Sequence, residues 1–69
     1  MILRERLKKA REKSGLTQVQ VAEKAKISEI SYQRIEYNKQ QPSLKTAQLI
    51  AIALNTTVEQ LFPLADDQN

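Results

Sequence analysis

The stretch from Thr17 to Tyr37, TQVQVAEKAKISEISYQRIEY, constrains the fold of this chain more than any other part of it. Thr17 is suited to begin a helix, because its hydroxyl can accept a hydrogen bond from a free backbone amide of the first turn. Gln20, three residues later, completes the sequence pattern of a capping box. Apolar residues then recur at helical spacing and predict one buried side, namely Val21, Ala22 and Ala25.

A second short helix is expected to follow Ser28, which can cap it, with Tyr32 and Ile35 on its inward side. Only Lys26 and Ile27 separate the two helices, and this connection is too short for antiparallel stacking. The helices must therefore cross steeply, with Ile27 beneath the crossing. This is the arrangement of a helix-turn-helix, whose second helix can enter the major groove of DNA.

Three further helices are expected outside this stretch. Leu3, Leu7 and Ala10 recur at helical spacing and predict an amphipathic helix over residues 1–14. Gly15 can end it, because glycine readily adopts the left-handed conformation found at helix ends.

Pro42 prevents the motif from continuing as a helix, and Ser43 can cap a new one over residues 44–54, which Asn55 can close. Thr57 can cap a last short helix over residues 58–62. We therefore predict an all-α domain of five helices over residues 1–64, followed by a flexible acidic tail over residues 65–69. The predicted core comprises Leu3, Leu7, Leu16, Val21, Ala22, Ile27, Tyr32, Ile35, Leu44, Ile50, Ala51, Leu54, Val58, Leu61 and Phe62.

The composition excludes several chemistries. The chain contains no Cys and no His, so disulfides, thiolate zinc sites and imidazole catalysis are absent, and we expect no enzyme, metal or cofactor. No apolar run approaches the roughly 18 residues that span a bilayer, so we expect a cytoplasmic protein. The basic helix over residues 1–14 could instead lie on a membrane surface, but its apolar stripe is narrow and lacks aromatic residues.

Charge is distributed unevenly along the chain. Residues 1–45 contain all eleven Lys and Arg and five Glu, for a net charge of +6, whereas residues 46–69 carry −3. This asymmetry suits a molecule with one side facing phosphates, although ordinary solvated surface is the alternative explanation.

From Leu7 to Phe62 the chain resembles the Cro/repressor-type (XRE-type) helix-turn-helix DNA-binding domains of phage repressors and small bacterial regulators. The pieces that carry the resemblance are GLTQ at 15–18, Ala22, Ile27-Ser28, RIE at 34–36, PSL at 42–44 and VEQLF at 58–62. The resemblance implies a compact five-helix lambda-repressor-like fold with the helix-turn-helix in its second and third helices. Two departures are Lys26, where the family usually has Gly, and Tyr37-Asn38, where it usually has Asn-Gly.

The second helix of the motif is expected to read DNA bases through Glu29, Ile30, Gln33 and Arg34. Arg34 can form two hydrogen bonds to guanine and Gln33 two to adenine. Glu29 can accept a hydrogen bond from cytosine, and Ile30 can pack on a thymine methyl group. The alternative is that these residues are only the solvated face of a packed helix.

Other residues are expected to hold the DNA backbone or the scaffold. The predicted backbone contacts are Gln18, Ser28, Asn38, Lys39, Gln40 and Ser43. The resemblance also implies an ion pair between Arg11 and Glu36 that fixes the first helix against the recognition helix.

An apolar pair, Leu49 and Ile52, is expected to lie outside the inward stripe of its helix. With Asn55 and Thr56 it predicts a contact between two copies of the chain, although extra core contact is equally compatible. The sequence thus predicts a transcriptional regulator, a repressor that binds an inverted repeat of double-stranded DNA as a homodimer. The alternative is an antitoxin or protein-interaction module with a protein partner.

Overall fold

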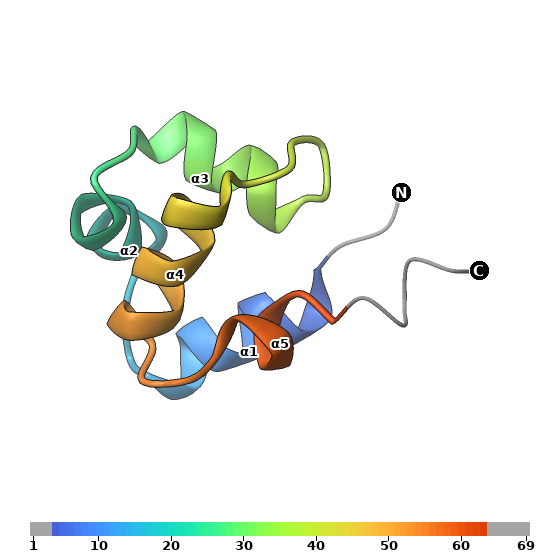
Figure 1. Ribbon diagram of the computed structural model, residues 1–69. Helices are drawn as coiled ribbons and strands as arrows, with labels where there is room; N and C mark the ends of the chain where they lie inside the picture. Colours follow the sequence, from blue (N-terminus) through green and yellow to red (C-terminus); the bar gives the residue numbers. More distant parts are fainter. Residues whose placement is uncertain (1–3, 64–69) are drawn as a thin grey trace.

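The computed structural model describes residues 4–63, a range that contains helices and no strand (Figure 1). The helices are α1 (Glu5–Lys13), α2 (Gln18–Ala25), α3 (Glu29–Glu36), α4 (Leu44–Ala53) and α5 (Val58–Leu61). Helix α2 packs against α3 and α4, and α1 packs against α3 and α5. In Figure 1, α3 lies along the upper edge of the molecule and α5 along the lower edge. The predicted all-α fold with five helices is confirmed.

Side-chain caps define where four of the five helices begin. In each case a hydroxyl oxygen accepts a hydrogen bond from the backbone amide three residues later. The capping hydroxyls, with their distances to that amide, are Thr17 (3.1 Å), Ser28 (3.1 Å), Ser43 (3.1 Å) and Thr57 (3.2 Å). At α2 the capping box is complete, because the Thr17 amide also donates to Gln20 Oε1 at 2.8 Å.

Left-handed residues define where helices end. The backbone φ angle is +74° at Gly15, +61° at Lys26, +59° at Asn38 and +56° at Asn55. Asn tolerates this conformation better than most residues, whereas Lys adopts it at a cost of about 1 kcal/mol relative to Gly. Lys26 therefore carries a local strain that the rest of the fold tolerates.

A single apolar core lies between the helices. Its largest fully buried apolar side chains come from four of them, namely Leu7, Val21, Tyr32, Ile35 and Ile50. The partly buried side chains that pack against the core are Ala10, Leu16, Ile27, Leu49, Val58 and Phe62.

Two predictions about α4 are wrong. Leu44 was expected in the core but is 70% exposed, because it is the first residue of α4 and lies between the exposed Ser43 and Lys45. Leu49 was expected outside the core but packs against it. Because α4 contacts both α2 and α5, its buried arc is wider than one apolar stripe. The predicted core residue Leu3 and the predicted tail over residues 65–69 lie outside the described residues.

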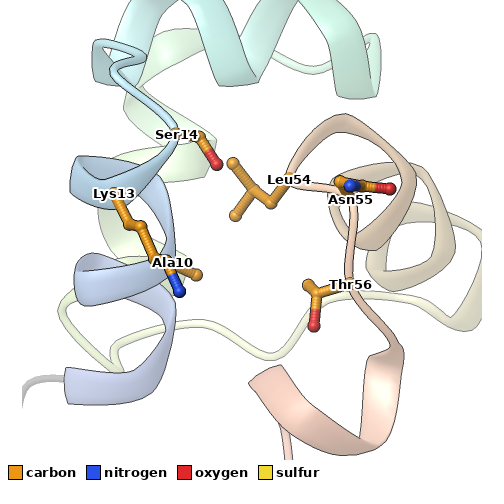
Figure 2. Close-up of a pocket in the computed structure, with 6 residues that line it drawn as sticks. All are labelled: Ala10, Lys13, Ser14, Leu54, Asn55 and Thr56. Carbon is orange, nitrogen blue, oxygen red and sulfur yellow. The ribbon is translucent and has the colours of Figure 1, made fainter.

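An open pocket of about 390 Å³ lies between the end of α1 and the turn that follows α4 (Figure 2). Its lining residues are Ala10, Lys13, Ser14, Leu54, Asn55 and Thr56. Between residues 4 and 63, no helix is both long and apolar enough to cross a membrane.

Candidate nucleic-acid interface

Helices α2 and α3 form a helix-turn-helix with a three-residue connection. Lys26 reverses the chain in its left-handed conformation, and the Ile27 amide donates to the Ala22 carbonyl at 3.0 Å. Ile27 then packs partly buried against the core, and Ser28 begins α3. The crossing is thus held by one strained backbone residue and one apolar side chain.

One side of α3 is buried and the other faces solvent. Tyr32, Ile35 and Glu36 are buried. The four predicted base-reading residues lie on the outer side: Glu29, Ile30 and Arg34 are exposed, Ile30 by 60%, and Gln33 is half-buried. Their spacing along the helix places them on one face. This face combines a carboxylate, an amide, a guanidinium and an apolar side chain.

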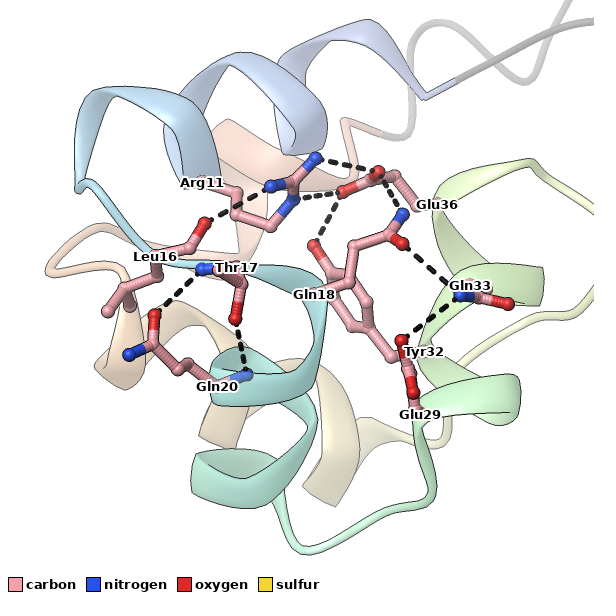
Figure 3. A network of polar contacts seen from close by, with 9 residues as sticks. All are labelled: Arg11, Leu16, Thr17, Gln18, Gln20, Glu29, Tyr32, Gln33 and Glu36. Carbon is pink, nitrogen blue, oxygen red and sulfur yellow. Dashed lines mark hydrogen bonds and ion pairs between the residues drawn. The ribbon is translucent and has the colours of Figure 1, made fainter.

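The predicted backbone-contacting residues lie before and after this face. Ser28 precedes α3, and Asn38, Lys39 and Gln40 follow it in the loop that leads to Ser43; all five are exposed. The loop is closed onto the end of α3 because the Lys39 amide donates to the Arg34 carbonyl at 2.7 Å. Gln18, the sixth predicted residue, is half-buried and points toward α3 rather than away from the molecule (Figure 3).

A buried carboxylate lies directly behind the outer face of α3. Glu36 has a side chain that is 1% exposed, and it forms an ion pair with Arg11, with Nε to Oε2 at 2.8 Å and Nη2 to Oε1 at 3.2 Å (Figure 3). The Tyr32 hydroxyl donates to Oε2 at 2.8 Å, and Gln18 Nε2 donates to Oε1 at 2.9 Å. Arg11 Nη1 also donates to the Leu16 carbonyl at 3.1 Å. The ion pair therefore fixes α1, α2 and α3 relative to one another.

The pKa values of these groups reflect their contacts. Burial alone raises the pKa of the Glu36 carboxyl, but the hydrogen bonds from Arg11, Tyr32 and Gln18 outweigh burial and hold it below its ordinary value. The hydrogen bond to Glu36 raises the pKa of the Arg11 guanidinium. Burial, followed by the hydrogen bond to Glu36, raises the pKa of the Tyr32 hydroxyl. The site therefore holds an ionised carboxylate and a neutral phenol at neutral pH.

The polar network continues from the buried carboxylate to the surface of α3. Gln33 Nε2 donates to Gln18 Oε1 at 3.3 Å and to Glu29 Oε2 at 3.3 Å (Figure 3). Residues 4–63 contain no buried side-chain nitrogen or oxygen without a hydrogen-bond partner. Two of the predicted base-reading side chains are thus tied to each other and, through Gln18, to Glu36.

Sequence reasoning missed Arg4, which connects three separate parts of the structure. Its Nε donates to the Ile35 carbonyl at 2.9 Å and its Nη2 donates to Gln41 Oε1 at 2.9 Å. Its backbone amide donates to the Glu36 carbonyl at 2.9 Å, and its guanidinium lies 5.1 Å from the centre of the Phe62 ring. Arg4 therefore satisfies the carbonyls at the end of α3 and holds the loop that follows. An isolated Arg thirty-one residues before its partner gives no local sequence signal.

The predicted dimer residues lie on and after α4. Ile52 is 74% exposed, whereas Leu49 is partly buried against the core. Asn55 and Thr56 line the pocket at the end of α4 (Figure 2). Within the described segment, no cluster of His, Cys, Asp or Glu is arranged to hold a metal ion.

Comparison with known proteins agrees with this geometry. A sequence model with the description Helix-turn-helix matches residues 7–61. The chain belongs to this helix-turn-helix family. It is 33% identical over 66 residues to a protein of Archaeoglobus fulgidus named "Uncharacterized HTH-type transcriptional regulator", covering 96% of this chain and 94% of that protein.

A solved structure titled SinR protein/SinI protein complex is similar in fold, with a TM-score of 0.81 and 25% sequence identity. The similarity covers 99% of this chain and 67% of that one. The XRE-type helix-turn-helix assignment is therefore confirmed, and the chain is a DNA-binding transcriptional regulator.

Proposed function

We propose that this helix-turn-helix protein is a repressor that binds an inverted-repeat operator as a homodimer, with α3 in the major groove. The observation that carries the proposal is the outer face of α3. It presents Glu29, Ile30 and Arg34 to solvent beside the half-buried Gln33, while the buried Glu36 holds the helix from behind. Repression would follow from occupying DNA that polymerase needs, so no catalytic residue is required.

The chemistry of the outer face supports base reading. Arg34 offers a planar fork of donors that matches guanine, and Ile30 is apolar at a position that the core does not use. Phosphate contacts from both ends of α3 would set the register of the helix in the groove without selecting sequence. For that role we propose Ser28 before α3 and Asn38, Lys39, Gln40 and Ser43 after it, together with Gln18 at the start of α2.

Selection of bound duplexes from a random pool at near-physiological salt tests the proposal. A preferred motif with two-fold symmetry is expected, and binding of all duplexes with equal affinity would refute it. Arg34→Ala should relax the preference at one base position by about 1–3 kcal/mol. Lys39→Ala, the matched variant, should weaken binding to all DNA sequences alike. It should also reduce the slope of the logarithm of the binding constant against the logarithm of the salt concentration by about one.

The dimer part of the proposal rests on α4. One helix-turn-helix reads only a few base pairs, whereas a two-fold dimer reads half-sites about 10 base pairs apart. Ile52 provides an apolar side chain in solvent, and Asn55 and Thr56 would complete the contact, whereas Leu49 packs against the core. Sedimentation on operator DNA should give two protein chains per duplex, and Ile52→Ser should weaken the second binding event. A single chain on the full operator would contradict the dimer.

A protein-interaction role, such as that of an antitoxin, is the second candidate. The observation in its favour is that the similar SinR structure was solved as a complex with SinI. Purification of the chain from its native host separates the candidates. A stoichiometric small protein partner would favour the second, and recovery of the chain alone would favour the first.

A further inference from the structure

The ionised carboxylate of Glu36 determines how the amide of Gln18 is oriented. A carboxylate can only accept hydrogen bonds, so Gln18 must present its NH2 group to Glu36 Oε1, where Nε2 lies at 2.9 Å. The reverse orientation would bring two acceptor oxygens together. The carbonyl oxygen of Gln18 therefore points away from Glu36 and toward Gln33 (Figure 3).

The same reasoning determines the orientation of Gln33 on the outer face of α3. Its side-chain amide faces two acceptors, Gln18 Oε1 and Glu29 Oε2, each 3.3 Å from Gln33 Nε2. An NH2 group has two hydrogens, and each of them has one of these acceptors. Gln33 Oε1 consequently points away from both neighbours (Figure 3).

We propose that Gln33 reads DNA as a hydrogen-bond acceptor alone and selects a base that carries an exocyclic amino group in the major groove. This inference rests on the proposed function and deepens it. A glutamine that is free to turn binds adenine through two bonds, accepting from N6 and donating to N7. Here the donor end is occupied, so only the amino group is read, at N6 of adenine or N4 of cytosine. Guanine O6 and thymine O4 offer acceptors and are disfavoured at this position.

The first step of the test is random-pool selection with the wild-type protein and with Gln33→Ala. The base position whose preference disappears in the variant is the one that Gln33 reads. Every base pair carries one exocyclic amino group in the major groove, on adenine or on cytosine, so the contacted atom is identified in the second step. No preferred sequence for the wild-type protein would overturn the proposed function itself. The absence of any Gln33-dependent position would overturn only the present inference.

The second step replaces single atoms in the selected duplex. Removing the exocyclic amino group should weaken wild-type binding by about tenfold, the effect of one hydrogen bond to a base. Replacing N7 of the purine in that pair by carbon, as a 7-deazapurine, should change affinity by less than about twofold. A tenfold loss on the 7-deaza duplex that is seen with the wild-type protein and not with Gln33→Ala would show that Gln33 also donates and would overturn the inference.

A positioning variant tests the cause of this orientation. In Gln18→Ala combined with Glu29→Ala, both acceptors for the Gln33 amide are lost, and the amide is free to turn. The variant should become sensitive to the 7-deaza replacement. It should still fold, because each lost side chain is at the surface or half-buried. Circular dichroism checks that the variant is folded. A folded variant that is still insensitive would overturn the assignment of this constraint to Gln18 and Glu29.

Discussion

Removing Arg11 while keeping the bulk of its side chain gives a direct test of how the fold is held together. In Arg11→Met the apolar stem is retained, but the Glu36 carboxylate, 1% exposed, loses both of its charged contacts. Only the neutral donors Tyr32 and Gln18 remain. Removing one partner of a buried ion pair costs about 3–5 kcal/mol, because the other charge stays buried without compensation.

That cost is large for a chain of this size. A domain of 69 residues has a free energy of unfolding of about 3–10 kcal/mol, from 0.05–0.15 kcal/mol per residue. Arg11→Met should therefore leave the domain barely stable in urea titrations followed by far-ultraviolet circular dichroism. Lys9→Ala, at an exposed position of the same helix, should change the free energy by less than about 0.5 kcal/mol.

A double variant separates the loss of the ion pair as a whole from the loss of one partner, which leaves the other charge buried and unpaired. In Arg11→Met with Glu36→Leu no charge is stranded, so this double variant should be more stable than Arg11→Met alone. The reasoning is refuted if Arg11→Met costs less than about 1 kcal/mol, which is the range of an exposed pair. It is also refuted if the double variant is the less stable of the two.

Three further predictions concern single positions. Lys26→Gly should stabilise the domain by about 0.5–1 kcal/mol in urea titrations, because glycine has no penalty at φ +61°; destabilisation would contradict the strain argument. Folding lowers the pKa of the Glu36 carboxyl. The contribution of this carboxylate to the free energy of unfolding should therefore be fully present above about pH 5 and be lost as pH drops through the folded pKa. The stability difference between wild type and Glu36→Gln should therefore shrink below about pH 4 in urea titrations, and a constant difference would refute this. Arg4→Ala should lower the free energy of unfolding by about 1.5–3 kcal/mol in urea titrations, the range for a hydrogen bond that involves a charged group. Lys9→Ala should change it little, and equal losses in the two variants would show that the contacts of Arg4 are unimportant.

The elements that depend on neighbouring residues were predictable from the sequence. Thr17, Ser28, Ser43 and Thr57 begin helices because a hydroxyl needs only the amide three residues later. The left-handed conformation of Lys26 agrees with the resemblance, in which the family usually has Gly at this position. Such features are determined within one turn of backbone.

The elements that depend on distant neighbours were not predictable in the same way. Leu44 has the right spacing for the core, but spacing gives only the side of the helix on which a residue lies. It does not show whether other residues cover that side at the start of α4. Leu49 is covered because α4 touches two helices, a fact of topology and not of the α4 sequence. Arg4 acts on residues more than thirty positions away. The link from Glu36 through Gln18 to Gln33 also requires the packed fold, because these residues come from two helices.

The buried carboxylate connects the stability of this domain with the orientation of the side chains that we propose to read bases. An apolar residue in place of Glu36 could pack behind α3 without the desolvation cost of a buried ion pair. Such a residue could not orient Gln18, because only an acceptor fixes the direction of an amide. Glu36 accepts two contacts from Arg11 and one from Tyr32, which hold the helices together, and one from Gln18, which leads to the outer face of α3. The ionised carboxylate therefore determines which ends of the Gln18 and Gln33 amides donate and which accept, and close packing alone would not determine this.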